Sequence, residues 1–270
     1  MCEISVCIPV YNGERFIKKS IESVLNQTYS NFELLIIDNC STDDTVSIVK
    51  SFNDKRIRFI QNETNLGMIG NWNKCIKESK GKYINIVCAD DRLKEDCLEK
   101  KVKMMTENDD VVFVFSGTDV IDETGKVILK RNGLKRTGVY SGMKIFKKSL
   151  RTRNIFGEPT NVLFNKDMID SDVIYSGDLP YSPDWEFWLR LSTFGNVGFY
   201  KESLAEFRVS TVSTTDKILK DRKKLKVDSK RFFDNVSKYA EVKKLDIFLN
   251  RLYQRIRTFE KKVFFIIIAK

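Results

Sequence analysis

The first hundred residues alternate apolar runs with amphipathic segments, and this alternation constrains the fold more than any other feature. The runs ISVCIPVY, FELLIIDN, IRFIQN and KYINIVC have the character of buried strands. The segments between them carry apolar residues at helical spacing, as in GERFIKKSIESVLNQ. Strands that alternate with helices form βαβ units, so the sequence predicts an α/β fold with parallel strands.

The pattern changes after residue 110. VVFVFSGTDVIDETGKVIL predicts two strands around a turn at Gly125, and NVGFYKESLAEFRVS predicts two more short strands. Between them, SPDWEFWLRLSTFG predicts a helix that Pro183 opens and Gly195 ends. We therefore expect a mixed sheet flanked by helices, in a chain of 270 residues that is long enough for one large domain with an appendage.

Histidine is absent from the chain, and this excludes several kinds of site. A Ser-His-Asp triad, a Cys-His dyad and every His-ligated zinc or iron site are ruled out. A metal would have to be held by oxygen atoms, which favours Mg²⁺ or Mn²⁺. The six cysteines have no C-x-x-C spacing, and the N-terminus has no basic stretch before its apolar run. We expect a reduced, cytoplasmic protein without a secretory signal.

The positive charge is concentrated at the C-terminal end. Residues 217–270 contain 17 Lys and Arg against 6 Asp and Glu, whereas residues 1–216 contain 30 against 31. Apolar residues recur in this tail at spacings of three and four, which predicts an amphipathic helix with a basic opposite face. We expect this helix to lie peripherally on an anionic membrane surface, at its inner face; the alternative is that it packs on the rest of the chain or on a second subunit. The stripe comprises Leu245, Phe248, Leu249, Leu252, Ile256, Phe259 and Val263.

Three of the predicted strands end in polar pairs: Tyr11-Asn12, Asp38-Asn39 and Asp90-Asp91. The carboxyl ends of parallel strands meet at one edge of the sheet, where such folds bind ligands. The aspartate pair alone has two interpretations, because Asp91 could cap the helix that begins near Lys94 or the pair could serve a metal or catalytic site. Neither glycine-rich nucleotide fingerprint occurs, which argues against a Rossmann dehydrogenase or a P-loop enzyme.

Several segments together resemble the family 2 glycosyltransferases of the GT-A fold. They are SVCIPVYNGERFIKKSIESVLNQTYSNFELLIIDNCSTDDT, NLGMIGNWNKCIKESKGKYINIVCADD and PDWEFWLRLSTFGNVGFYKESLAEFRVS. The resemblance implies a GT-A-type, Rossmann-like mixed sheet over residues 1–214, with a nucleotide-binding part (1–110) and an acceptor and catalytic part (111–214). Residues 215–270 would form the basic helical tail.

The resemblance also implies site residues. Asp184 would be the catalytic base, Asp91 would ligate Mn²⁺ or Mg²⁺, and Asp90 would approach the ribose or the donor sugar. The dipole of the helix that starts here would keep Asp184 ionised at neutral pH. The remaining donor-site positions are Pro9, Val10 and Tyr11 around the nucleobase, Asp38 bonded to the base, and Asn65 and Gly67 beside the nucleotide.

The implied function is inverting transfer of a sugar, of the hexosyltransferase type and metal-dependent. The donor would be a nucleotide-diphosphate sugar, UDP-linked, and the acceptor a saccharide or a lipid-linked molecule in bacterial surface polysaccharide or glycoconjugate biosynthesis. The sequence departs from the family pattern at three positions. Cys88 stands where many members have Asp, Pro183 where they have an acidic residue, and Ser210 where they have His. The alternatives are a catalytically lapsed sugar-nucleotide-binding module and a sugar nucleotidyltransferase. A nucleic-acid partner is not expected, since the tail lacks a reader motif.

Overall fold

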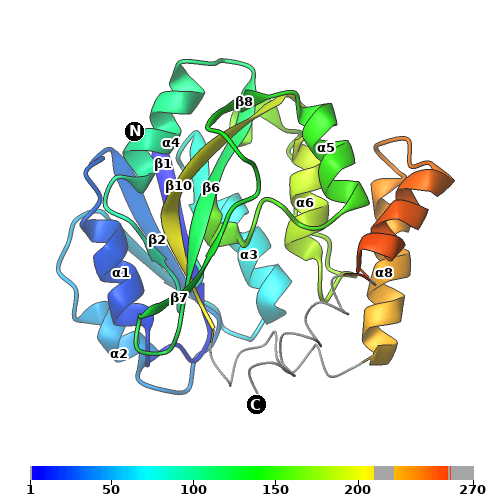
Figure 1. The fold of residues 1–270 in the computed structure, drawn as a ribbon. Helices are drawn as coiled ribbons and strands as arrows, with labels where there is room; N and C mark the ends of the chain where they lie inside the picture. The colour runs from blue at the N-terminus through cyan, green and yellow to red at the C-terminus, as the bar shows by residue number, and fades with distance from the viewer. Residues whose placement is uncertain (1, 210–221, 255, 257–270) are drawn as a thin grey trace, which may run out of the picture.

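A computed structural model describes residues 2–209, 222–254 and 256, and its strands join in one sheet (Figure 1). The sheet order is β3-β2-β1-β4-β9-β6-β10-β5, with β7 added to β6 and β8 to β10. The strands are β1 (Ile4–Val10), β2 (Phe32–Asp38), β3 (Ile57–Gln61), β4 (Tyr83–Ile86), β5 (Arg92–Leu93), β6 (Val111–Ile121), β7 (Val127–Arg131), β8 (Gly138–Tyr140), β9 (Val162–Asn165) and β10 (Asn196–Arg208). The helices are α1 (Ile17–Leu25), α2 (Thr45–Lys50), α3 (Gly67–Glu78), α4 (Cys97–Thr106), α5 (Gly142–Arg151), α6 (Pro183–Leu191) and α8 (Arg222–Val236), with 3₁₀ turns η1 (Pro159–Asn161) and η2 (Lys166–Met168).

The sheet is mixed, as the sequence predicts. Strands β3, β2, β1 and β4 run parallel, and β10 runs parallel to β6. Strand β9 lies between β4 and β6 and is antiparallel to both. The predicted parts 1–110 and 111–214 therefore share one continuous sheet, and the division of the chain into domains stays a prediction.

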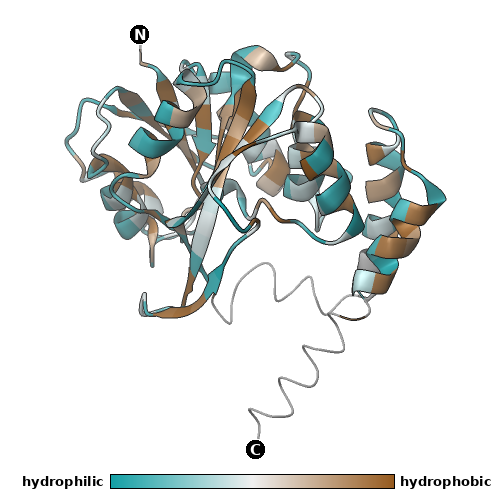
Figure 2. Cartoon of the chain, turned by 45° about the horizontal axis from the view of Figure 1, so that its top comes forward, coloured by the Kyte–Doolittle hydropathy of each residue, from teal (hydrophilic) through white to brown (hydrophobic). Residues whose placement is uncertain are grey.

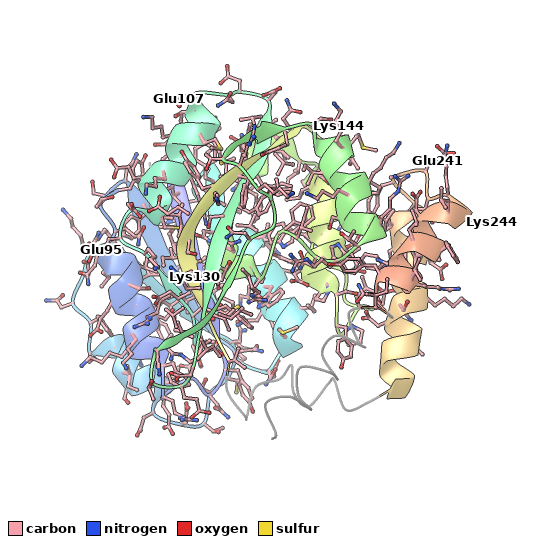
Figure 3. The ribbon with its side chains drawn as sticks, in the orientation of Figure 1. Glu95, Glu107, Lys130, Lys144, Glu241 and Lys244 are labelled. Carbon is pink, nitrogen blue, oxygen red and sulfur yellow. The ribbon has the colours of Figure 1, made fainter. Side chains whose placement is uncertain are left out.

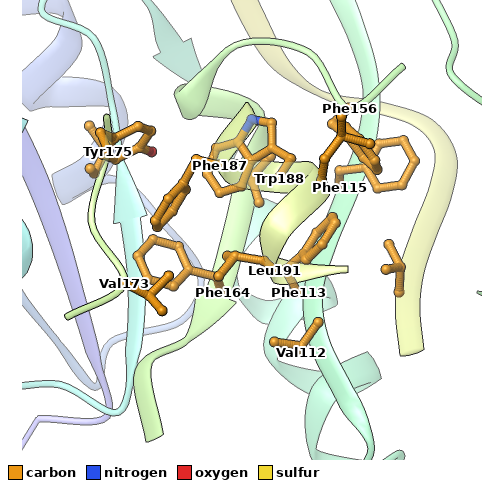
Figure 4. Packing of buried hydrophobic residues seen from close by; sticks show 14 of the residues in the cluster. Val112, Phe113, Phe115, Phe156, Phe164, Val173, Tyr175, Phe187, Trp188 and Leu191 are labelled. Carbon is orange, nitrogen blue, oxygen red and sulfur yellow. The ribbon is translucent and has the colours of Figure 1, made fainter. Parts of the chain in front are cut away.

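Both faces of the sheet are covered, and each face has its own hydrophobic core. Strand β2 shows why, because Leu35 and Ile37 face one core while Leu34 and Ile36 face the other. The apolar strands accordingly form the brown centre of Figure 2. The first core is rich in aromatic rings, which Figure 4 shows packed around Trp188 of α6. This packing fixes α6 against the sheet.

One predicted boundary is wrong. The sequence predicts two short strands where the structure has the single long β10, whose register against β6 shifts between Tyr200 and Ser203 and again between Ser203 and Ala205. Irregularities of this kind place extra residues on one strand, so the alternation of side chains is interrupted although the strand continues. The turn at Gly125 is confirmed, with a φ of 96° that glycine adopts readily.

The tail packs on the domain through α8 and through a further helix, residues 244–254, here named the terminal helix. The Phe232 ring of α8 lies 4.5 Å from that of Trp185 in α6. In the terminal helix, Asp246 Oδ1 lies 2.6 Å from Arg151 Nε, and the Asn250 side chain donates to the Leu150 carbonyl oxygen at 2.7 Å.

The apolar stripe of the terminal helix faces away from the domain, and the face opposite to it is not basic. The buried Asp246 and Asn250 lie on that opposite face, so the expected basic face is wrong over the described residues 244–254. The exposed stripe consists of Leu245, Phe248 and Leu252 together with Ile256, a helical residue just past the end of the terminal helix as defined here. Lys244 lies beside it and projects outward in Figure 3. Phe259 and Val263 lie outside the described residues, and within the described part no helix is long and apolar enough to cross a membrane.

Replacing Phe232 by alanine should destabilise the protein, whereas replacing Phe248 should not. Phe232 is 3% exposed and Phe248 is 61% exposed. Truncating a buried Phe costs about 3–5 kcal/mol, so Phe232→Ala should lower the midpoint of thermal unfolding by several degrees. Differential scanning calorimetry of the two variants beside the parent makes the comparison. Equal midpoints for both variants would show that α8 is not docked as the structure has it.

Candidate active site

The ends of β1, β2 and β4 meet at one edge of the sheet, as their sequence order predicts. Val10 and Asp38 are register partners in β1 and β2. After β4, the Val87 amide donates to the Cys7 carbonyl oxygen of β1 at 2.8 Å. The polar pairs that follow these strands are therefore drawn from distant parts of the chain to a common edge.

The residues assigned to the nucleobase differ in their access to a ligand. Pro9 and Val10 are buried, whereas the Tyr11 side chain is 51% exposed. Asp38 is fully buried, and its Oδ2 accepts hydrogen bonds from the Ser41 amide at 3.1 Å and from Gln61 Nε2 at 3.2 Å. Its Oδ1 is buried without a hydrogen-bond partner. Tyr11 is thus the one of these four side chains that can stack directly on a base.

Asn65 and Gly67 lie exposed beside this group, and Asn39 holds them there. Asn39 Nδ2 donates to Asn65 Oδ1 at 2.9 Å and to the Gly67 carbonyl oxygen at 3.2 Å. Gly67 has a φ of 72°, which favours glycine. Asn39 was not assigned a role from the sequence, although its place beside Asp38 at a strand end was the signal that could have found it.

The adjacent Asp90 and Asp91 have different surroundings. Asp91 is fully buried, and its oxygens accept hydrogen bonds from Thr160 Oγ1 at 2.6 Å and from the Arg208 amide at 2.9 Å. Asp90 is partly exposed, and its backbone carbonyl oxygen accepts from Arg208 Nε at 2.8 Å. Burial and the neighbouring Asp90 raise the pKa of Asp91 well above its usual range. Asp91 is therefore tied into the framework, while Asp90 lies partly exposed at the edge, where burial still raises the pKa of its carboxyl.

This difference decides how the pair could hold a metal ion. The described residues contain no group of three or more Cys, Asp or Glu side chains arranged as a metal site. Mg²⁺ is, however, often held by one or two carboxylates together with substrate phosphates. Asp90 fits that arrangement as a single protein ligand, whereas Asp91 offers no exposed oxygen.

Asp184 lies in the first turn of α6, directly after Pro183. Its Oδ2 accepts a hydrogen bond from Asn154 Nδ2 at 3.0 Å. Burial, and secondly the negative charge of Glu158, raise the pKa of Asp184 to about 7. The expectation that the helix start keeps this carboxyl fully ionised is wrong, because the stabilisation by backbone amides is smaller than the penalty of desolvation. A carboxyl with this pKa can both accept and release a proton near neutral pH.

Glu158 connects the two aspartate sites, and sequence reasoning missed it. Its charge raises the pKa of both Asp91 and Asp184. Its Oε1 forms an ion pair with Arg131 Nη1 at 2.9 Å, and its Oε2 is buried without a hydrogen-bond partner. In the sequence, Glu158 is an acidic residue in a predicted turn before Pro159 and Thr160. Acidic residues in turns are ordinarily solvated, so this position alone did not indicate a role in the site.

Comparison with known proteins agrees with this arrangement. The family described as Glycosyl transferase family 2 matches residues 5–172. An uncharacterized glycosyltransferase of Haemophilus influenzae is 32% identical over 215 residues, covering 76% of this chain and 65% of that protein. One from Methanocaldococcus jannaschii is 33% identical over 211 residues, covering 76% and 70%. One from Rickettsia bellii is 36% identical over 220 residues, and the chain spans only 30% of its length.

Solved structures share the fold at low identity. Residues 1–349 of TarS from S. aureus align over 95% of this chain and 73% of that chain, with a TM-score of 0.71 and 18% identity. A complex of the same TarS fragment with UDP has a TM-score of 0.65 and 20% identity, and the alignment covers 77% of this chain and 61% of that chain. The mannosyltransferase PcManGT from Pyrobaculum calidifontis, in complex with GDP-Man and Mn²⁺, has a TM-score of 0.62, at 15% identity over 86% and 64%. The match to the family over more than half of the chain, on a sheet with this arrangement, shows that the protein belongs to glycosyltransferase family 2.

Proposed function

We propose that the protein transfers a sugar from a UDP-linked donor to an acceptor hydroxyl with inversion at the anomeric carbon. The observation that carries this proposal is the position of Asp184, a partly exposed carboxyl in the first turn of a helix fixed by the aromatic core, where its pKa is raised to about 7. Such a group accepts the hydroxyl proton as the acceptor oxygen bonds to the anomeric carbon and the bond to the leaving diphosphate breaks. Attack from the face opposite the diphosphate gives inversion.

The donor assignment rests on the sheet edge. Tyr11 offers an exposed ring for the base, and the buried Asp38 lies at the end of the neighbouring strand. The TarS structures in complex with UDP and UDP-GlcNAc share this fold, which supports a UDP-linked donor. We place Mn²⁺ or Mg²⁺ on Asp90 and the donor diphosphate, where it would neutralise charge on the leaving group. The metal assignment thus moves from Asp91 to Asp90, because Asp91 is fully buried whereas Asp90 is partly exposed.

The acceptor and its biological setting are part of the same proposal. A saccharide or lipid-linked acceptor in surface polysaccharide or glycoconjugate biosynthesis fits a protein that docks peripherally on the inner face of an anionic membrane. The exposed stripe of the terminal helix, defined above, supports docking, because the basic residues Lys244 and Arg251 flank it. Apolar side chains with adjacent positive charge are typical of interfacial helices.

The roles of the two neighbouring aspartates can be separated by calorimetry. Asp90→Asn should abolish the enhancement of UDP binding by Mn²⁺ and leave thermal stability near that of the parent, because its carboxylate is partly exposed. Asp91→Asn should keep the enhancement and lower the free energy of unfolding by about 1–3 kcal/mol, because it disturbs two buried hydrogen bonds. Loss of the Mn²⁺ enhancement in Asp91→Asn but not in Asp90→Asn would instead identify Asp91 as the metal ligand.

The role of Asp184 as a base predicts a pH dependence. Below pH 7 its carboxyl is protonated and cannot accept a proton, so donor hydrolysis or transfer should fall as the pH drops through about 7. Asp184→Asn should reduce the rate of donor hydrolysis or transfer by about 10²–10⁴-fold and remove the fall in rate below pH 7. UDP binding, measured by calorimetry, should stay nearly intact. UDP release from a panel of UDP-sugars, measured between pH 5 and 9, tests this.

The matched control is Asp172→Asn, an exposed aspartate with no role in the site. It should keep the parent's rate and pH profile. Equal loss of UDP binding and turnover in Asp184→Asn would make Asp184 a donor ligand or a structural residue. Absence of turnover in the parent with every donor, despite UDP binding, would favour the lapsed binding module.

Membrane docking predicts a preference for anionic vesicles. The protein should sediment with phosphatidylglycerol vesicles and little with phosphatidylcholine vesicles, and salt should weaken the binding, because each basic residue near the surface contributes about 1 kcal/mol. Phe248→Asp places a charge in the exposed stripe and should reduce binding strongly, while the exposed Val127→Asp on β7 should not. Equal binding to both lipids, or a stable dimer that Phe248→Asp dissociates, would reject membrane docking.

A further inference from the structure

A small cavity lies beside the candidate base. Its volume is about 270 Å³, which is just below the usual range for ligand pockets and suits a single sugar ring. Asn154, which donates to Asp184, forms part of the wall, and Trp185 follows Asp184 in α6. Gln254 of the terminal helix also contributes, so the tail completes the cavity. The remaining lining residues are Thr118, Arg131, Asn132, Gly133, Arg153, Phe156, Gly157, Glu158 and Asn161.

The charged side chains of this cavity do not balance. Arg131 is compensated, since its Nη1 lies 2.9 Å from Glu158 Oε1 and its guanidinium lies 4.8 Å from the centre of the Phe207 ring. Among the described residues, the side chain of Arg153 makes one hydrogen bond, from its Nη2 to the Asn132 carbonyl oxygen at 3.3 Å. No ion pair between described residues includes Arg153. Within the part of the chain that the structure describes, the cavity therefore has one positive charge without an acidic partner.

The cavity also has hydrogen-bond donors that lack acceptors. Nε and Nη2 of Arg131 are buried and without hydrogen-bond partners. These two donors have no exposed surface, so the guanidinium that a ligand in the cavity can reach is that of Arg153, which is partly exposed. A guanidinium group binds a planar or tetrahedral oxyanion through two parallel hydrogen bonds, which an ammonium group cannot do.

From these contacts we infer that the cavity binds the acceptor, and that this acceptor is a sugar carrying an oxyanion, either a carboxylate or a phosphate, held by Arg153. The inference rests on the proposed transferase function, because it uses Asp184 to define the reacting end of the cavity. It adds the chemical class of the acceptor, with the hydroxyl directed toward the wall at Asn154, behind which Asp184 lies, and the oxyanion directed toward Arg153.

Ligand-observed NMR titration of the UDP-saturated protein tests the inference. The probes are methyl β-D-glucuronide with a carboxylate, glucose 6-phosphate with a phosphate, and the neutral methyl β-D-glucoside. At least one anionic probe should bind at least about tenfold more tightly than the neutral probe. The anionic probe that binds more tightly shows whether the acceptor carries a carboxylate or a phosphate. Arg153→Gln should weaken that probe about tenfold or more, while Arg153→Lys, which keeps the charge but loses the fork, should be intermediate.

Arg136→Gln is the matched control, an exposed arginine outside the cavity, and should match the parent. Equal affinity for neutral and anionic probes, unchanged affinity in Arg153→Gln, or binding of none of the three would overturn the inference. UDP affinity and donor hydrolysis are measured on the same samples. If these are normal while the anionic probes fail, the acceptor inference falls alone; if they are absent, the proposed function falls.

Discussion

The site depends on one buried carboxylate, that of Asp91. Its two oxygens accept hydrogen bonds from residues 69 and 117 positions away, Thr160 in η1 and Arg208 at the end of β10. Burying a carboxylate costs several kcal/mol unless hydrogen bonds compensate, so these partners cannot be lost cheaply. Thr160 also accepts from the Cys88 amide at 3.0 Å. Asp91 thereby joins the end of β4 to two segments from the second half of the chain and holds Asp90 at the edge.

Much of the fold was predictable, because strand and helix periodicity in the first hundred residues is strong and local. Every residue of β1 and β2 is buried, and both segments are largely apolar, apart from Ser5 in β1 and Glu33 and Asp38 in β2. The convergence of Tyr11, Asp38 and Asp90 on one edge follows from parallel strand order alone. The single β10 was not predictable, because its register shifts disturb the alternation that marks a strand.

The chemistry of individual side chains was less predictable, because it depends on contacts between distant segments. The sequence identifies the Asp90-Asp91 pair, but their division into an exposed and a buried member depends on Thr160 and Arg208. The pKa of Asp184 likewise depends on burial and on Glu158, neither of which local sequence reveals. The sequence-based expectation for Asp184 considered only the dipole of helix α6. Burial and the charge of Glu158 have a larger effect on its pKa than that dipole.

The tail is coupled to the candidate base by its polar face. Asp228 of α8 accepts hydrogen bonds from the Tyr181 amide at 2.9 Å and from Ser182 Oγ at 2.6 Å, directly before α6. Because these residues lead into the turn that carries Asp184, α8 helps to fix where that carboxyl points. Helix α8 also packs on the domain through the buried Phe232, whereas the terminal helix turns Asp246 and Asn250 to the domain. If the apolar stripe of the terminal helix packed on the domain, it would be buried and could not contact a bilayer. The terminal helix packs on the domain through Asp246, Asn250 and Ile247, and its exposed stripe stays available for the membrane attachment proposed above.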